Sequence, residues 1–306
     1  RHLAPGEYLV GSGTPNIGFA SQSFQKARLT MEYALKDGDP EGVRFGCEVI
    51  QSWIRVRQQE SGLFRKGTRP VPGKTFTDAS EVGWAIGELS RTTMFLRAHR
   101  DEIEALGCDA DGYADEFETS VHRLVKAILK SLPGDGGLGS QWDFTSGEMI
   151  NSAGDCGGFV LMGLVRYWKF TNDRQVRKVI DDAFRSDDQM IIFPAGLCSR
   201  KSKGVIKDRE WGKAFIKKSI DTDRYIVPVH FIGENSKRFY RVANLCKTLK
   251  IKFNLAMLLL PDELYRARNG KYKVIIGKPI APSFFDSSKT HMEWAQWSRS
   301  MCTRCK

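Results

Sequence analysis

The hydrophobic pattern changes near residue 176, and this change constrains the fold more than any other feature of the 306-residue sequence. Before it, apolar residues recur at three- to four-residue steps in segments that end at Gly, Asp or Pro, which predicts amphipathic helices. After it, short continuous apolar runs alternate with helical segments, which is typical of an α/β layer. We therefore expect a mixed fold, with helical hairpins over residues 1–175 and a partial α/β layer over residues 176–306.

The first half contains predicted helices but no long strand-like alternation. Ser21 is predicted to be the N-cap of the first helix, and Pro40 can open the second because its missing N–H costs nothing there. We expect these helices to pack on one another as hairpins. The predicted helices cover about 21–36, 40–60, 78–99, 114–132 and 152–171.

Two segments, 33–39 and 167–173, each end a helix in an aromatic-rich turn followed by Gly-Asp or Asn-Asp. This recurrence resembles the six-hairpin (α/α) toroids of many glycoside hydrolases, although five helices are too few to close such a barrel. The resemblance implies general acid/base catalysis by two carboxylates that flank a glycosidic bond. Acids at helix starts or loop ends can also simply cap helices. The candidates are Asp78, Glu81, Glu148 and Asp155.

The second half is predicted to contain strands around residues 190–193 and 225–231. Both runs are continuously apolar and are bounded or interrupted by Pro or Gly, so we expect buried parallel strands. Residues 208–219 give a helix between them. Residues 253–260 and 272–276 supply further strand candidates.

Three short motifs lie in this half in a fixed order: Phe-Pro-Ala-Gly at 193–196, Ile-Val-Pro-Val at 226–229 and Ile-Gly-Lys-Pro-Ile at 276–280. Their order and spacing resemble the lysophosphatidic acid acyltransferase superfamily. The string FPAGLCSRK at 193–201 is most similar to its bacterial hemolysin-like and ornithine-lipid acyltransferase branch. The resemblance implies transfer of an acyl chain to a lipid acceptor, in glycerolipid or aminolipid synthesis. The donor would be a thioester on acyl carrier protein or coenzyme A.

The same resemblance implies which residues bind the substrate. Glycine in the first motif lets the backbone approach the substrate closely, and a nearby basic side chain holds its polar head. The family form has Glu after the Pro and Arg two residues past the Gly, whereas this chain has Ala195 and Cys198. We therefore expect Arg200 and Lys201 to bind the polar head of the substrate in place of the missing Arg. This departure from the family form puts a phosphate-containing acceptor in doubt. The predicted substrate-binding residues are Phe193, Pro194, Gly196, Arg200, Lys201 and Pro228.

Acyl transfer in this superfamily depends on a His-x-x-x-x-Asp motif upstream of these blocks, in which His is the general base. None of the five histidines has Asp five positions later. The catalytic residues are therefore unidentified, and we expect activity to be impaired.

Charge is unevenly distributed along the chain. Residues 200–278 carry 20 Lys and Arg against 7 Asp and Glu, or +13, while the whole chain carries +11. Such a region attracts anionic partners, so we expect an anionic lipid or lysolipid acceptor and a membrane surface rather than nucleic acid. The segment 237–252, rich in Lys and Arg, could lie on that surface or could be a solvated helix. A non-enzymatic module that binds anionic lipids is an alternative reading.

Seven irregularly spaced cysteines favour a reducing compartment over a disulfide framework. Cys302 and Cys305 form a CxxC pair with no second ligand pair nearby, so no metal and no cofactor are predicted. No apolar run is long enough to span a bilayer. We expect a bacterial protein that is cytoplasmic and peripheral to the inner face of the membrane. Because each half looks incomplete, a joined or truncated reading frame is an alternative to a natural two-domain protein.

Overall fold

The helices of the N-terminal region form where apolar residues recur at helical spacing, and Asp side chains cap several of them. In this computed structural model, Asp39, Asp78, Asp109 and Asp173 each accept a hydrogen bond from a backbone N–H of the first helical turn. The residues described are 20–65, 75–152, 157–196, 198–202, 204–249, 256, 259–268, 270 and 272–304.

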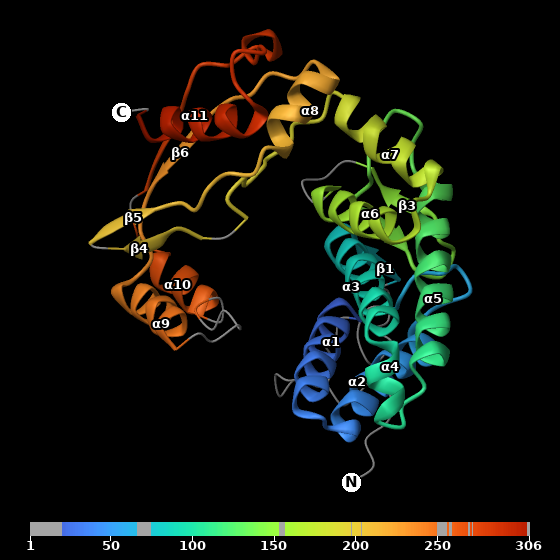
Figure 1. The fold of residues 1–306 in the computed structure, drawn as a ribbon. Helices are drawn as coiled ribbons and strands as arrows, with labels where there is room; N and C mark the ends of the chain where they lie inside the picture. The colour runs from blue at the N-terminus through green and yellow to red at the C-terminus, as the bar shows by residue number, and fades with distance from the viewer. Residues whose placement is uncertain are drawn as a thin grey trace. The chain divides into compact units, whose positions relative to one another are not determined.

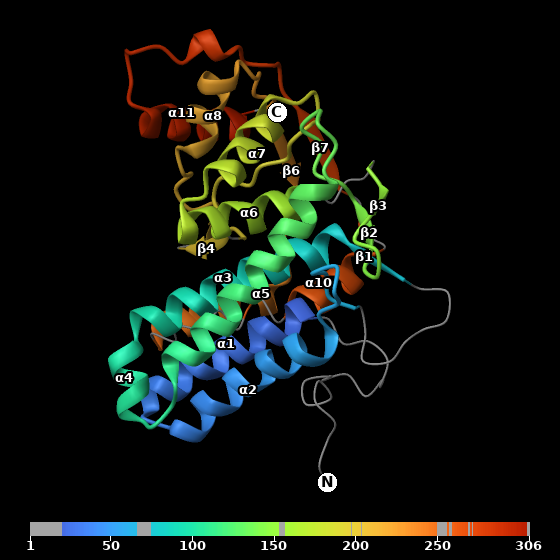
Figure 2. The ribbon, with the colours of Figure 1, turned by 90° about the vertical axis from the view of Figure 1, so that its right-hand side faces the viewer.

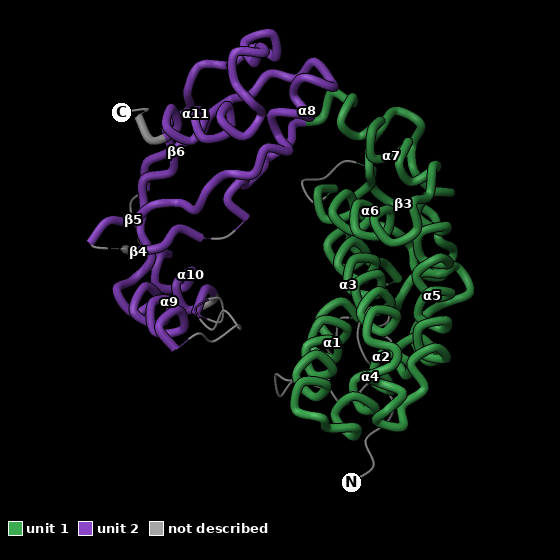
Figure 3. Tube along the Cα trace, viewed as in Figure 1, with its two compact units in different colours: residues 1–188 green, residues 189–306 purple. Residues whose placement is uncertain are grey.

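The chain divides into two compact units, residues 1–188 and 189–306 (Figure 3). In the described part of the first unit, the five predicted helices are confirmed and two shorter ones are added (Figure 1). They are α1 (Ala20–Asp37), α2 (Pro40–Arg57), α3 (Ala79–Ala98), α4 (Arg100–Ala105), α5 (Ala110–Ser131), α6 (Gly157–Thr171) and α7 (Arg174–Arg185).

Helix α3 is the centre of the first unit and packs on α6, α5 and α1. Two glycines let α3 and α6 approach closely. A Cβ on Gly83 would lie 2.0 Å from the Phe159 carbonyl oxygen, and one on Gly163 would lie 2.4 Å from the Gly83 carbonyl oxygen. A larger side chain at either position would force the helices apart. The helices of the first unit therefore pack around α3. The closed toroid stays a prediction.

A buried ion pair also joins these helices. Glu88 of α3 is fully buried, and its carboxylate accepts from Arg28 Nε of α1 at 2.8 Å. Arg166 Nη1 of α6 lies 3.4 Å from the other carboxylate oxygen. Because the opposite charges offset the cost of burying one another, the contacts of Glu88 with Arg28 and Arg166 fix how α1 and α6 meet α3.

The first unit also contains a small sheet that the sequence pattern did not predict. Strands β1 (Phe76–Asp78), β2 (Gln141–Asp143) and β3 (Met149–Asn151) form an antiparallel sheet in the order β1-β2-β3 (Figure 2). Each strand is only three residues long, too short to show alternation. Trp142, in the middle strand, is completely buried.

The second unit combines short strands with helices, as the mixed fold class predicts. Within the described residues, its strands form two separate antiparallel pairs, β4-β5 and β6-β7. The elements are β4 (Arg200–Ser202), β5 (Val205–Lys207), α8 (Ala214–Thr222), β6 (Val229–Ile232), α9 (Lys237–Thr248), α10 (Leu260–Ala267), β7 (Lys273–Ile276), η2 (Pro282–Phe284) and α11 (His291–Arg304).

The prediction of buried parallel strands is wrong. Residues 190–193 belong to no strand of the described chain, and Ile191 and Phe193 are 84% and 81% exposed. Strand β6 pairs antiparallel with β7, with Val229 opposite Ile276. A continuous apolar run predicts burial on both faces only where layers cover both faces, and the described part of this unit does not supply them. Of the predicted strand 253–260, residues 253–255 and 257–258 lie outside the described residues.

Candidate functional site

The second and third motifs lie side by side in the second unit. Ile226 and Ile280 exchange both backbone hydrogen bonds, at 3.0 and 2.8 Å. Gly277 N–H donates to the Pro228 carbonyl at 2.8 Å, and the β6-β7 ladder continues the pairing. Two motifs about fifty residues apart in sequence therefore form one continuous antiparallel ribbon.

The first motif is a turn held by its own backbone. Gly196 N–H donates to the Phe193 carbonyl at 3.0 Å, and Gly196 has φ +66°, which a side chain would strain. The Pro194 carbonyl accepts from Gly212 N–H at 3.0 Å. This bond fastens the turn to the segment that leads into α8.

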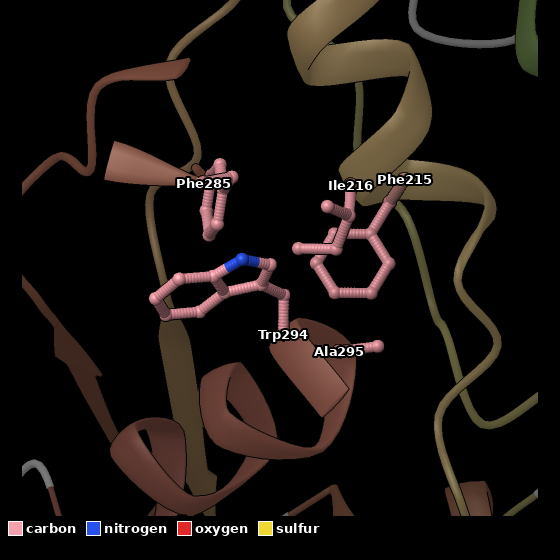
Figure 4. Packing of buried hydrophobic residues seen from close by; sticks show 5 residues of the cluster. All are labelled: Phe215, Ile216, Phe285, Trp294 and Ala295. Atoms are coloured by element: carbon pink, nitrogen blue, oxygen red, sulfur yellow. The ribbon is translucent and has the colours of Figure 1, made fainter. Parts of the chain in front are cut away.

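One apolar cluster supports the site (Figure 4). In the figure the Trp294 indole of α11 lies between Phe285 and the α8 pair Phe215 and Ile216. Trp211, Ile226 and Ile280 pack against this cluster from outside. The cluster therefore supports the second and third motifs directly, and it reaches the first through Trp211, the neighbour of Gly212.

Four polar residues that sequence reasoning did not select hold the loop before α8. Asp208 accepts from Ser199 Oγ and from Trp211 Nε1, the latter at 3.3 Å. The Gln296 amide of α11 donates to the Trp211 carbonyl at 2.8 Å, and Arg299 donates to the Asp208 carbonyl. The sequence does contain one pattern that points to α11: the three-residue spacing of Trp294 and Trp297 places both on one face of a C-terminal helix, which also carries Gln296 and Arg299.

The two predicted basic residues stand on β4, but their environments differ. Arg200 Nη1 donates to the Cys198 carbonyl at 2.8 Å, and its guanidinium lies 5.9 Å from the centre of the Phe239 ring. The remaining N–H groups of a guanidinium can still bind an oxyanion. Lys201 lies opposite Ile206 of β5 and is partly exposed.

The arrangement suits binding better than proton transfer. Phe193 is exposed and Pro228 is half-buried, so a ligand could reach both motifs. The histidine of the motif region, His230, lies on β6 opposite Ile275 and has no carboxylate partner within the described chain. Without an orienting acid, an imidazole is a poorer general base for a hydroxyl acceptor.

The acids predicted for carbohydrate chemistry are spread over the first unit. Asp78 caps α3 at the Gln141 end of the small sheet, whereas Glu148 stands beside Asp143 at the other end. Glu81 points inward, where its carboxylate accepts from Ser21 N–H at 3.1 Å and from Ser21 Oγ. Asp155 lies outside the described residues.

The contacts of Glu81 also correct the predicted role of Ser21. Ser21 lies inside α1 and bonds to α3, so it is not an N-cap. Burial raises the pKa of Glu81 to about 7, although the hydrogen bonds from Ser21 act in the opposite direction. The structure therefore gives Glu81 a packing role at the α1–α3 contact.

A groove of about 1030 Å³ lies elsewhere in the first unit, along α5, α6 and α7. Its lining includes Asp115 and Glu118, both paired with Arg97 of α3, and His122, whose ring packs edge-on against Tyr167 at 5.4 Å. None of the three predicted acids within the described residues, Asp78, Glu81 and Glu148, lines it. Within the described residues, no group of three His, Cys, Asp or Glu could hold a metal ion. No described helix combines the length and apolar character needed to cross a bilayer.

Comparison with known proteins assigns the region that contains this site. Residues 171–301 match the acyltransferase family. The C-terminal region of the chain is therefore an acyltransferase-family region, as the three motifs predict.

Two curated relatives are lyso-glycine lipid O-acyltransferases. That of Bacteroides thetaiotaomicron is 54% identical over 124 residues, which are 40% of this chain and 46% of the relative. That of Phocaeicola vulgatus is 49% identical over 131 residues, which are 43% of this chain and 47% of the relative. The matched segment spans about half the length of either relative. No solved structure matches the chain significantly.

Proposed function

We propose that the C-terminal region binds the lipid acceptor of an O-acyl transfer reaction, and that the acceptor is a lysolipid with an amino-acid head group. The acyl donor would be a thioester on acyl carrier protein or coenzyme A. The observation that carries the proposal is the convergence of the three motifs on one ribbon and one turn, supported by a common apolar cluster. The names of both relatives favour lyso-glycine lipid as the acceptor.

The proposed roles follow from the contacts. The Gly196 turn lets the acceptor approach the backbone, while Arg200 and Lys201 attract its carboxylate. Phe193 and Pro228 offer apolar contact to the lipid chain. Binding would place the acceptor hydroxyl for attack on the thioester carbonyl. Because its acceptor is a membrane lipid, the region would act at a membrane surface, and we propose that this is the inner face.

Turnover by this chain alone should be low. No histidine in the 306 residues has Asp five positions later, and a positioned general base is worth about 10²- to 10⁴-fold in rate. Acceptor binding and catalysis are therefore separable here.

The test measures both. Binding of lyso-glycine lipid would be followed by isothermal titration calorimetry, and transfer by incubation with radiolabelled acyl carrier protein and, separately, acyl-coenzyme A. The full-length Bacteroides relative is the positive control. We expect binding with transfer close to background. Lys201→Ala should weaken binding, whereas Lys207→Ala, a matched change on the facing strand β5, should not. Absence of binding would refute the acceptor role, and rapid transfer would refute the impairment.

A further inference from the structure

Helix α9 has an inward face that is already fully used. Phe239, Tyr240, Ala243 and Cys246 are buried, and Phe239, Tyr240 and Ala243 form a cluster with Ala256. This face fastens α9 to the second unit. The partly buried Val242 packs against the same cluster, whereas Leu245 and Leu249 are not part of it.

The outward face of α9 nonetheless carries exposed leucines. Leu245 and Leu249 are 56% and 59% exposed, and Leu249 continues the helix because its N–H donates to the Leu245 carbonyl at 2.9 Å. Leu245 and Leu249 follow Arg238 by seven and eleven residues, and they follow Arg241 by four and eight. At 100° per residue, the four side chains therefore lie within one sector of about 80° of the helix surface. The helix thus presents a stripe of two arginines followed by two leucines, the α9 stripe.

The surroundings of the α9 stripe are strongly basic. The twelve residues of α9 include Lys237, Arg238, Arg241 and Lys247 and no acid. Residues 189–306 carry 24 Lys and Arg against 9 Asp and Glu, or +15. Arg238 does lie 3.3 Å from Asp262 of α10, but an exposed pair of this kind holds its partners weakly.

Helix α10 lies beside α9 and adds residues of the same type (Figure 1). Ser236, the N-cap of α9, donates to Glu263 of α10 through both its N–H and its hydroxyl. Leu264 and Tyr265 of α10 are 75% and 64% exposed, and the Arg268 guanidinium lies 4.4 Å from the centre of the Tyr265 ring.

We propose that the α9 stripe docks the second unit on a bilayer that contains anionic lipid. The leucines enter the boundary between head groups and acyl chains, and the arginines reach the lipid phosphates. Charge complementarity argues for this occupant, because an uncharged apolar partner would leave the arginines desolvated and unpaired. The inference rests on the proposed function, in that docking brings the acceptor site to the membrane where its lipid resides.

Vesicle co-sedimentation of the full chain tests the proposal, with vesicles of phosphatidylcholine alone and with 30% phosphatidylglycerol. We expect binding that requires phosphatidylglycerol and weakens with salt. Arg238→Gln with Arg241→Gln should reduce the partition coefficient about 30-fold, since each basic residue is worth about fivefold. Leu245→Ser with Leu249→Ser should reduce it about tenfold.

Matched controls come from exposed residues of the first unit. Lys126→Gln with Lys130→Gln, and Val56→Ser with Ile150→Ser, should leave vesicle binding unchanged. Circular dichroism melting of the leucine variant should match the parent, because neither leucine is in the core. Equal binding to neutral vesicles, or equal losses in the control variants, would overturn the proposal. Dimerisation abolished by the leucine changes would also overturn it, since the stripe would then bind a second copy.

The outcome separates this proposal from the proposed function. We expect the α9 stripe variants to lose vesicle binding but to keep binding of lyso-glycine lipid below its micelle concentration. This result would show that the substitutions affect docking alone. If the parent chain binds vesicles but not the monomeric lysolipid, the acceptor role fails and the docking surface stands.

Discussion

Replacement of the buried carboxyl of Glu81 by an amide should make the first unit more stable at alkaline pH. The pKa of Glu81 is raised from 4.5 to about 7, chiefly by burial. Below pH 4.5 the carboxyl is protonated in both states. Between pH 4.5 and about 7 only the unfolded chain ionises, so the free energy of unfolding falls as pH rises. At 1.36 kcal/mol per pH unit, the loss is about 3 kcal/mol and is complete above pH 7.

Glu81→Gln removes this titration and keeps the shape of the side chain, and its amide can still bond to Ser21. The free energy of unfolding should therefore be similar in variant and parent at pH 4.5, and about 3 kcal/mol higher in the variant at pH 8. Hydrogen exchange of peptides from α3, measured in urea, reports this quantity for the first unit alone. Glu148→Gln, at an exposed carboxyl, is the control and should follow the parent. A difference between Glu81→Gln and the parent that is the same at pH 4.5 and pH 8 would refute the reasoning.

Three further changes have definite expected results. Glu88→Gln should destabilise the first unit by about 3 kcal/mol, because the buried Arg28 then keeps its ion pair with the partly exposed Glu32 but loses the one with the buried carboxylate, and urea unfolding would measure the loss. Trp294→Ala should destabilise the second unit by about 4 kcal/mol by opening a cavity in the cluster below the motifs, while α3 peptides keep their exchange protection. Gly196→Ala should strain the first motif by about 1 kcal/mol through its left-handed backbone and weaken lysolipid binding, with the melting of the first unit unchanged. A stable Glu88 or Trp294 variant, or a Gly196 variant with full binding, would contradict the corresponding argument.

The functional proposals for the two units rest on different kinds of observation. The second unit contains the acyltransferase-family motifs, and its proposed activity can be tested with defined lipids. The glycan hypothesis for the first unit stays a prediction. Asp78 and Glu148 stand at opposite ends of a small sheet, and Glu81 is buried against α1. Thermal shift against a glycan panel would test that hypothesis without assuming a catalytic pair.

The sequence by itself determined the five long helices of the first unit and the three motifs of the second. Helix formation depends on neighbours three and four residues away and on caps such as Asp78, so it can be seen in a local pattern. Motif order is likewise written along the chain, and it was enough to predict an acyltransferase-family region that the comparison confirms.

Only the tertiary structure decided how distant residues meet. The antiparallel pairing of Ile226 with Ile280, the bond from Ser21 to Glu81 across sixty positions, and the exposure of Phe193 all depend on which surfaces pack together. An apolar run is equally compatible with a buried parallel strand and an exposed connection, because burial is a property of the layers around it. The same holds for Glu81, whose pKa is set by the helix that covers it.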